Sequence, residues 1–487
     1  MLARAGRWGF RHDPRVPIVV TGDALTLGDV LRVARHGDRV ELAPPARDAM
    51  TSARRLADEW ITRGEPAYGI STGVGVRRTV PARDHDAMLL RQHITPHPPV
   101  AKPDVTRAAA LRLVNALAGG AAAIRPEVAD RFVAALNDDK LPQISIGGMI
   151  GVGDLSPLAE LAVGVLGDMP LAGGEMIALI NQAAVTVGIA ALALADTGDL
   201  LDALDVALAL DFEALPANRS VIDPMVERAR PYPGVRATLP RLRALLEGGE
   251  RAEVALQDPA SFRSAPLVHG AARDAIDVAL DRLTVELNAH QSNPYVDTAA
   301  SRIVSVGNWD VQPLATALDL VRIALAPVLT SAGERTLKLL QSSKTGLPDG
   351  LAARAGTAES GLGEHAISLQ PLVAEARALA APVSYDVVST TGAEGIEDRM
   401  TLAPLAARRL GEMVTLGRRI VAVGLLVSAQ ACDLRGRALG RGTAAAHAAV
   451  REVAPRQGEG ARPADLEPLV ALVESGRFSQ LTAAVSA

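Results

Sequence analysis

Two segments of the sequence carry side chains suited to proton transfer on a small acid. Residues 68–75, YGISTGVG, place Tyr68 in a glycine-punctuated loop whose backbone can approach a ligand closely. Taken alone, a tyrosine in such a loop is more often a packed surface residue than a catalytic one. It acts as a base at neutral pH only if a cation or hydrogen-bond donors lower its pKa. Arg263 presents a planar fork of donors that suits a carboxylate, so the sequence predicts a small carboxylate-bearing ligand.

Two further polar residues leave more than one role open. Glu397 either holds an ammonium group, acts as a base or pairs with Arg399. His97 lies between two prolines in a rigid loop and is either a pocket donor or a structural hydrogen-bond partner. His93 and His97 have a spacing that suits a metal on a helix, but Pro96 interrupts that helix. No third ligand lies nearby in the sequence, so no metal site is predicted.

The elements that must position these residues are mainly helices. The chain has 487 residues, of which 48% are hydrophobic and only 2% aromatic, so its core is built mostly from Ala, Leu and Val. From Thr106 onward, segments with helical spacing are broken at glycines and prolines. Residues 311–342 predict a long helix with a kink at Pro327, and about 403–434 predict another.

The domain organisation follows from the same pattern. Residues 1–16 read as a flexible tail, and β-branched stretches at 17–21 and 40–42 predict a small strand-and-turn region. We expect an N-terminal domain over 17–215, a central helical bundle over 216–455 and a short helical appendage over 456–487.

Composition also argues against several classes of partner. The net charge is −5, with both signs spread along the chain, which disfavours a nucleic-acid partner. Cys432 is the only cysteine, so a reducing, cytoplasmic setting fits best. Residues 176–195 are uncharged and long enough to span a membrane, but they contain Asn181 and Gln182 and have acidic flanks. We therefore expect a helix buried on every side of a bundle and no membrane partner.

Ordered motifs along nearly the whole chain resemble the histidine/phenylalanine (aromatic amino acid) ammonia-lyase family. The matching segments are Tyr68-Gly69 with Thr72-Gly73 and Gly75, Asn115–Ala118, Arg125–Val128, Asp154-Leu155 with Pro157–Ala159, Glu175 with Ala178–Asn181, Gln257–Pro259 with Ser261–Arg263, Val268–Gly270, Glu286–Asn288, Asn293-Pro294, Gly307-Asn308, Gln312–Ala315 and Glu397-Asp398. The resemblance implies a mainly α fold, an ammonia-lyase/fumarase-like long-helix bundle with a small mixed N-terminal region. It also implies a homotetramer whose active sites draw residues from several subunits.

The same resemblance assigns roles to residues. Tyr68 falls at the position of the family's catalytic base, and Glu397 at that of a glutamate lining the pocket. His97 falls where the family has the histidine of a Ser-His pair, with Pro96 in place of the serine. The substrate-binding residues implied are Arg263, Asn181, Gln257, Asn308 and Trp309.

One tripeptide departs from the family pattern. The family's electrophile, a methylidene imidazolone, forms from Ala-Ser-Gly when the glycine nitrogen attacks the alanine carbonyl and the serine hydroxyl leaves as water. This chain has Gly151-Val152-Gly153 there. Valine has no β-hydroxyl to eliminate, so the methylidene cannot form by that route. We therefore expect no cofactor.

Other departures cluster around the same place. Ala260 replaces a tyrosine, Leu267 and Ile396 each replace a glutamine, and Trp309-Asp310-Val311 replaces a Phe-His-Gly run. The pocket is therefore remodelled for a different ligand or reaction.

Three functions compete at this point. The first is a lyase that needs no electrophile because its substrate brings a good leaving group, such as a quaternary ammonium or a thiol-linked group. Tyr68 would take the proton and Arg263 would hold the carboxylate, and the reverse addition or a cyclisation keeps the same roles. The second is a non-catalytic homologue that binds a small carboxylate or a partner protein, since fold and function separate readily. The third is an ordinary ammonia-lyase with an unusual electrophile.

Overall fold

The computed structural model of the chain describes residues 16–82, 85–250, 255–385 and 393–486. Its described residues fall into two compact units. The first lies within Met1–Ala193, Ala279–Leu318 and Val383–Arg408, and the second within Leu194–Val278, Asp319–Pro382 and Arg409–Ala487. These units are interleaved along the chain, whereas the domains expected from the sequence are contiguous and remain a prediction. The chain is mainly helical, which confirms the predicted fold class.

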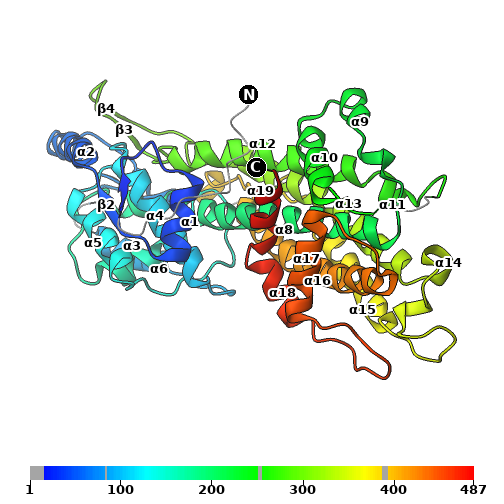
Figure 1. The fold of residues 1–487 in the computed structure, drawn as a ribbon. Coiled ribbons are helices and arrows are strands. Elements are labelled where there is room, and N and C mark those ends of the chain that lie inside the picture. The colour runs from blue at the N-terminus through cyan, green and yellow to red at the C-terminus, as the bar shows by residue number, and fades with distance from the viewer. Residues whose placement is uncertain (1–15, 83–84, 251–254, 386–392, 487) are drawn as a thin grey trace. The chain divides into compact units, whose positions relative to one another are not determined.

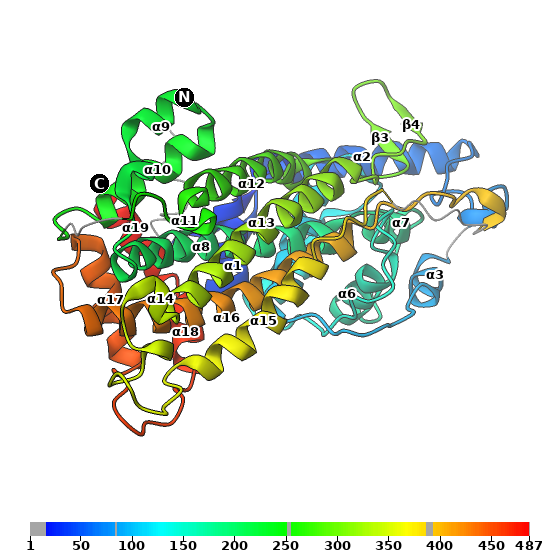
Figure 2. The same cartoon turned by 90° about the vertical axis from the view of Figure 1, so that its right-hand side faces the viewer.

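The first unit combines helices with two small sheets (Figures 1 and 2). Its elements are β1 (Ile18–Val20), α1 (Leu27–His36), β2 (Val40–Leu42), α2 (Pro44–Thr62), η1 (Gly75–Arg77), α3 (Asp86–Gln92), α4 (Pro103–Ala118), α5 (Pro126–Asn137), α6 (Leu155–Leu166), α7 (Glu175–Ile180), β3 (Tyr295–Asp297), β4 (Arg302–Val304) and η4 (Ala393–Gly395). β1 and β2 are parallel, with Ile18 opposite Val40, which confirms the predicted strand-and-turn region. β3 and β4 form an antiparallel pair. Helices α3, α6 and α7 pack against one another, as Figure 2 shows.

Prolines begin several of these helices. Pro44, Pro103 and Pro126 occupy the first turns of α2, α4 and α5. A proline is favourable there, because its missing N–H would have no intrahelical acceptor and its fixed φ suits the helix.

Four long helices contribute residues to both units. They are α8 (Ala184–Ala214), α12 (Ala265–Asn288), α13 (Gln312–Leu339) and α16 (Ala403–Arg435). The helices predicted over 311–342 and about 403–434 are thereby confirmed. Pro327 lies inside α13, and the helix continues through it.

The second unit is helical. Its elements are η2 (Arg219–Ile222), α9 (Pro224–Ala229), α10 (Pro233–Leu245), α11 (Ala260–Arg263), α14 (Ser342–Thr345), η3 (Asp349–Leu351), α15 (Gly363–Ala378), α17 (Arg441–Val453), α18 (Glu467–Glu474) and α19 (Arg477–Ser486). Helix α19 packs against α10 and α17, and α18 packs against α17 and α19 (Figure 1). The short helices predicted after residue 455 are therefore present.

The uncharged segment 176–195 corrects one expectation. It is not a single helix, because α7 ends at Ile180 and α8 begins at Ala184. The break is stable because distant groups satisfy its buried backbone: the Asp154 N–H donates to the Gln182 carbonyl at 2.7 Å, and the Ala183 N–H donates to Gln291 Oε1 at 3.0 Å.

The expected burial of this region is confirmed. By length and composition, the stretch Glu175–Ala214 and helix α13 would each suit a membrane span. The apolar window of Glu175–Ala214 is 94% buried inside the protein, which is the burial of a core helix.

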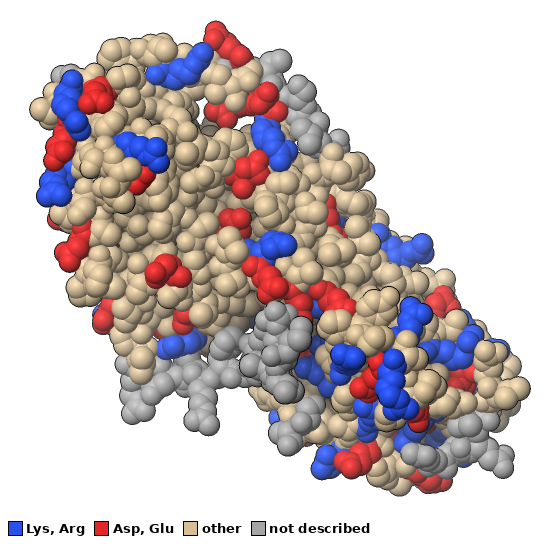
Figure 3. All heavy atoms as spheres, turned by 90° about the horizontal axis from the view of Figure 1, so that it is seen from above, with Lys and Arg blue, Asp and Glu red and all other residues tan. Residues whose placement is uncertain are grey.

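On the face shown in Figure 3, acidic and basic side chains are interspersed.

Candidate active site

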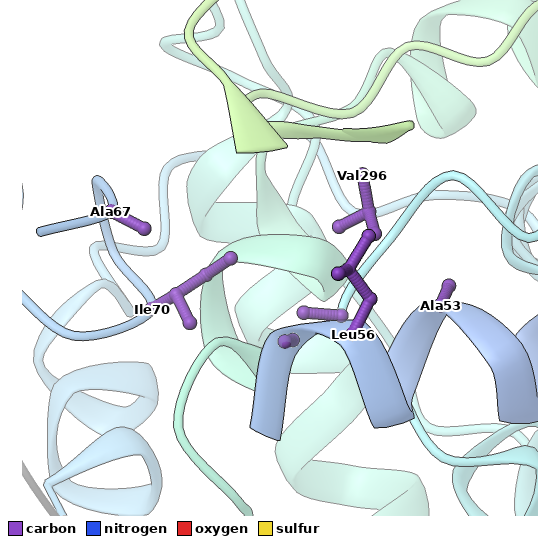
Figure 4. Packing of buried hydrophobic residues seen from close by; sticks show 7 residues of the cluster. Ala53, Leu56, Ala67, Ile70 and Val296 are labelled. Atoms are coloured by element: carbon purple, nitrogen blue, oxygen red, sulfur yellow. The ribbon is translucent and has the colours of Figure 1, made fainter. Parts of the chain in front are cut away.

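The loop that carries Tyr68 is anchored by apolar packing. Ala67 and Ile70 belong to a buried cluster with Leu56 of α2 and Val296 of β3, and Figure 4 shows the Ile70 side chain extending toward them. The Ala67 carbonyl accepts the N–H groups of residues 70, 71 and 72 within this turn. The backbone beneath Tyr68 is therefore held on both sides of the tyrosine.

Tyr68 is half-buried, and its hydroxyl accepts a hydrogen bond from the Gly75 N–H at 3.1 Å. Burial is the largest influence on its pKa and raises it. The Gly75 N–H and the Arg78 guanidinium act in the opposite direction, and the Glu397 carboxylate adds to the increase. The net pKa of Tyr68 is raised, because the lowering by Gly75 and Arg78 does not outweigh the effect of burial. A base role needs a further positive charge beside the phenol.

Glu397 lies close enough to Tyr68 for their charges to interact, and it too is half-buried. Burial raises the pKa of Glu397, and the neighbouring Asp398 carboxylate raises it further. The pairing with Arg399 that the sequence left open does not occur. Arg399 instead donates from Nε to Asp310 Oδ2 at 3.0 Å and from Nη2 to Gln312 Oε1 at 2.9 Å. Within the described residues, the Glu397 carboxylate has no hydrogen-bond or ion-pair partner.

The Gly151-Val152-Gly153 loop is fixed from two sides. Val152 forms an antiparallel bridge with Asp310 and is only 6% exposed. Thr401 Oγ1 donates to the Gly151 carbonyl at 2.6 Å, and the Thr401 and Leu402 N–H groups both donate to the Ile150 carbonyl. The loop therefore lies between the segment that begins α13 and the segment that begins α16.

Gly151 occupies a position that only glycine suits. Its φ is +81°, in the left-handed region that disfavours other residues. A Cβ atom added to it would lie 2.2 Å from Thr401 Oγ1 and 2.8 Å from Pro404 Cδ. Side-chain atoms do not approach this closely, so an alanine does not fit here unless Thr401 and α16 move.

Asn181 lies beside the same loop. It ends α7, its side-chain amide donates to the Asn293 carbonyl at 3.0 Å, and it is buried. A Cβ atom on Gly153 would lie 3.1 Å from Asn181 Oδ1, so these two residues are in contact. The structure thus brings Asn181 to the tripeptide loop, as its predicted role at the pocket requires.

The remaining predicted residues of the first unit are more exposed. The His97 ring lies beside Gly148. A Cβ atom added to Gly148 would lie 3.1 Å from His97 Cδ2. Among the described residues, the His97 side chain has no hydrogen-bond partner. Asn308 donates to the His290 carbonyl at 3.3 Å, and Trp309 is partly buried.

Gln257 and Arg263 belong to the second unit. Arg263 ends α11 and is exposed, and its Nε donates to the Asp258 carbonyl at 2.7 Å. Among the described residues its two terminal nitrogens have no partner, so they are available to a carboxylate. Gln257 is exposed.

Sequence reasoning missed two roles. Thr401 holds the Gly151 carbonyl and also accepts the Ala403 N–H at 3.2 Å. A threonine just before a predicted helix start is a known capping signal and would have marked it. Asp310 appeared in the sequence as a departure from the family, but its pairing with Arg399 had no local signal.

Comparisons with known proteins show which family the chain belongs to. Residues 25–171 and 166–452 match the family described as aromatic amino acid lyase. The chain belongs to the aromatic amino acid lyase family. It is 34% identical to histidine ammonia-lyase from Treponema denticola over 462 residues, which cover 88% of this chain and 90% of the relative.

Two solved structures share its fold. The ergothioneine-degrading enzyme ergothionase from Treponema denticola, in complex with desmethyl-ergothioneine sulfonic acid, is 25% identical. The match covers 95% of this chain and 99% of the ergothionase chain, with a TM-score of 0.89. Histidine ammonia-lyase from Trypanosoma cruzi is 28% identical and covers 96% of both chains with a TM-score of 0.88. The ammonia-lyase fold expected from the motifs is confirmed.

Proposed function

We propose that this member of the aromatic amino acid lyase family works without a methylidene imidazolone. Its substrate is a small carboxylate that carries a good leaving group of its own. The observation that carries the proposal is the Gly151-Val152-Gly153 loop. Val152 has no hydroxyl to lose, and the space beside Gly151 that an alanine methyl would need is filled by Thr401.

The residues present therefore do not fit the family's prosthetic group. We derive no step through that group.

The electrostatics of the site favour a substrate with a fixed positive charge. Glu397 is a half-buried carboxylate without a cationic partner among the described residues, and Tyr68 lies within its electrostatic reach. A quaternary ammonium bound beside both would pair with Glu397. The same charge would lower the raised pKa of Tyr68 toward the range in which it acts as a base.

A quaternary ammonium group also removes the need for the missing electrophile. Such a group leaves as a neutral tertiary amine, so it needs no covalent activation. Tyr68 takes the β-hydrogen as a proton, the C–H electrons form the α,β double bond, and the amine departs with the C–N electrons. One structural relative degrades ergothioneine, which is a betaine with a trimethylammonium group next to its carboxylate. We extend that substrate class, betaines of amino acids, to this chain.

Arg263 holds the substrate carboxylate in this proposal, through its two unpartnered terminal nitrogens. The homotetramer with shared sites that the family implies is part of the proposal, and in it Tyr68 and Arg263 need not come from one chain.

The test is a product analysis by mass spectrometry. The purified protein is incubated with N-trimethylated amino acids and with free amino acids. A separate incubation with cinnamate-like acids and trimethylamine tests the reverse addition. We expect an unsaturated acid and a tertiary amine from at least one betaine. The Tyr68→Phe variant should reduce this turnover by about 100-fold or more, whereas Tyr232→Phe, at an exposed tyrosine of the second unit, should leave it unchanged. Tight binding of a carboxylate with no turnover of any compound would instead indicate the non-catalytic homologue.

A further inference from the structure

Arg399 lies two residues beyond Glu397, yet each of its three guanidinium nitrogens donates a hydrogen bond to another residue. Nε donates to Asp310 Oδ2 at 3.0 Å, Nη2 to Gln312 Oε1 at 2.9 Å and Nη1 to the Met400 carbonyl at 3.2 Å. Two of these three acceptors come from the segment that begins α13. The position of Arg399 is therefore set by a part of the chain far from it in sequence.

Asp310 makes several contacts at once. Its Oδ2 holds Arg399, its Oδ1 accepts the Gln312 N–H at 2.8 Å at the start of α13, and its backbone bridges Val152. The carboxylate is about a quarter exposed, with 26% of its side-chain surface accessible, so its pairing with Arg399 is partly shielded from solvent. A single residue thus joins the tripeptide loop to the segment that carries Glu397.

Thr401 completes this connection from the other side. Its hydroxyl holds the Gly151 carbonyl, and its N–H holds the Ile150 carbonyl. Residues 399–402 are therefore attached to residues 150–152 directly through Thr401 and indirectly through Asp310. We call Asp310, Arg399 and Thr401 the loop clamp.

The charge on Arg399 gives the clamp a chemical consequence. If Asp310 did not hold it, the nearest acidic groups along its own segment would be Glu397 and Asp398. A guanidinium paired with Glu397 would neutralise the carboxylate that faces Tyr68 and would compete with a cationic ligand for it.

We infer that Asp310 is a positioning residue that keeps Arg399 away from Glu397, so that the Glu397 carboxylate remains available to the cationic group of the substrate. The identity of that group as a quaternary ammonium rests on the proposed function. The clamp itself does not, because it is a property of the free protein.

The first test uses binding selectivity, measured by calorimetry with two probes. Trimethylhistidine betaine carries the cation and the carboxylate, whereas cinnamate carries only the carboxylate. In Asp310→Asn, we expect the Kd for the betaine to rise by about tenfold or more, as for loss of a partly buried charge contact, with the Kd for cinnamate unchanged. In Asp310→Asn with Arg399→Gln, the competing cation is absent and betaine affinity should recover.

A merely structural role of Asp310 predicts a different pattern. Both probes would then bind more weakly in Asp310→Asn, and the double variant would be no better than the single one. Asp297→Asn is the matched control, because Asp297 pairs with Arg302 at the same 3.0 Å separation in the β3–β4 hairpin. It should leave both affinities at the wild-type level.

The second test needs no ligand and so separates this inference from the proposed function. Hydrogen exchange of the free protein follows the Thr401 and Leu402 amides, which donate to Ile150. Their exchange should be faster in Asp310→Asn than in the wild type or in Asp297→Asn. If the wild type binds neither probe but this difference appears, the proposed function fails and the clamp stands. Unchanged exchange at these amides overturns the clamp whatever the probes do.

Discussion

Replacing Gly151 by alanine is the sharpest perturbation of the tripeptide loop. The substitution adds one methyl group at a φ of +81°. That methyl carbon would lie 2.2 Å from Thr401 Oγ1, inside the hydrogen bond that Thr401 makes to the Gly151 carbonyl. We expect Gly151→Ala to destabilise the folded protein.

The magnitude has two parts. Placing an alanine in the left-handed region costs about 1–2 kcal/mol. Moving the Thr401 hydroxyl removes its hydrogen bonds to Gly151 and Ala403, at about 1 kcal/mol each. The free energy of unfolding should therefore fall by about 3–4 kcal/mol in total.

Gly248 provides the matched control. Its φ is +82°, and a Cβ atom there would meet nothing within 4 Å. Gly248→Ala should show only the backbone part, about 1–2 kcal/mol. Urea unfolding of both variants measures the difference. Equal losses in the two variants would refute the close contact with Thr401. The same conclusion would follow if the Gly151→Ala, Thr401→Ala double variant were no more stable than the sum of the two single-variant losses predicts.

Four further outcomes follow from the site and its surroundings. Tyr68→Phe should reduce kcat of the betaine elimination by about 100-fold or more, with little change in KM, in steady-state assays. Arg263→Ala should raise KM by about 10-fold to 100-fold, the equivalent of a charged hydrogen bond to the carboxylate, and an unchanged KM would remove Arg263 from the site. Burial raises the pKa of Asp154 to about 7, above its value in the unfolded chain. The contribution of this group to the free energy of unfolding is therefore fully present below about pH 4 and is lost as the pH rises through 7. The difference in unfolding free energy between wild type and Asp154→Asn should accordingly fall over that range, and a constant difference would contradict the assignment. Because burial also raises the pKa of the Cys432 thiol, iodoacetamide at pH 8 should label Cys432 only after urea is added, as peptide mapping would show.

Local pattern was sufficient for the long helices. Ala- and Leu-rich periodicity predicted α13 and α16 to within a few residues, because these helices are continuous and their ends carry ordinary breakers. The break between α7 and α8 could not be seen in the same way. It depends on Gln291, which is 108 residues away from the amide that it satisfies. An apolar segment gives no local sign of such a contact.

In the site, too, some features were predictable from the sequence and others depended on contacts between distant residues. The order of motifs predicted that Tyr68, Asn181 and the tripeptide loop share a site, and in the structure Asn181 lies in contact with Gly153. The partner of Arg399 was not accessible, because Glu397 is its sequence neighbour while Asp310 is 89 residues away. The direction of the Tyr68 pKa was also inaccessible, since it is decided by burial, and burial is a property of the folded loop.

We propose that this lyase works without the electrophile of its family, and the intact mass of the purified chain is the decisive measurement. We expect a mass equal to that of the unmodified sequence, measured on the same preparation that eliminates an amine from a betaine. A chain lighter by the water that cyclisation of residues 151–153 removes would contradict it.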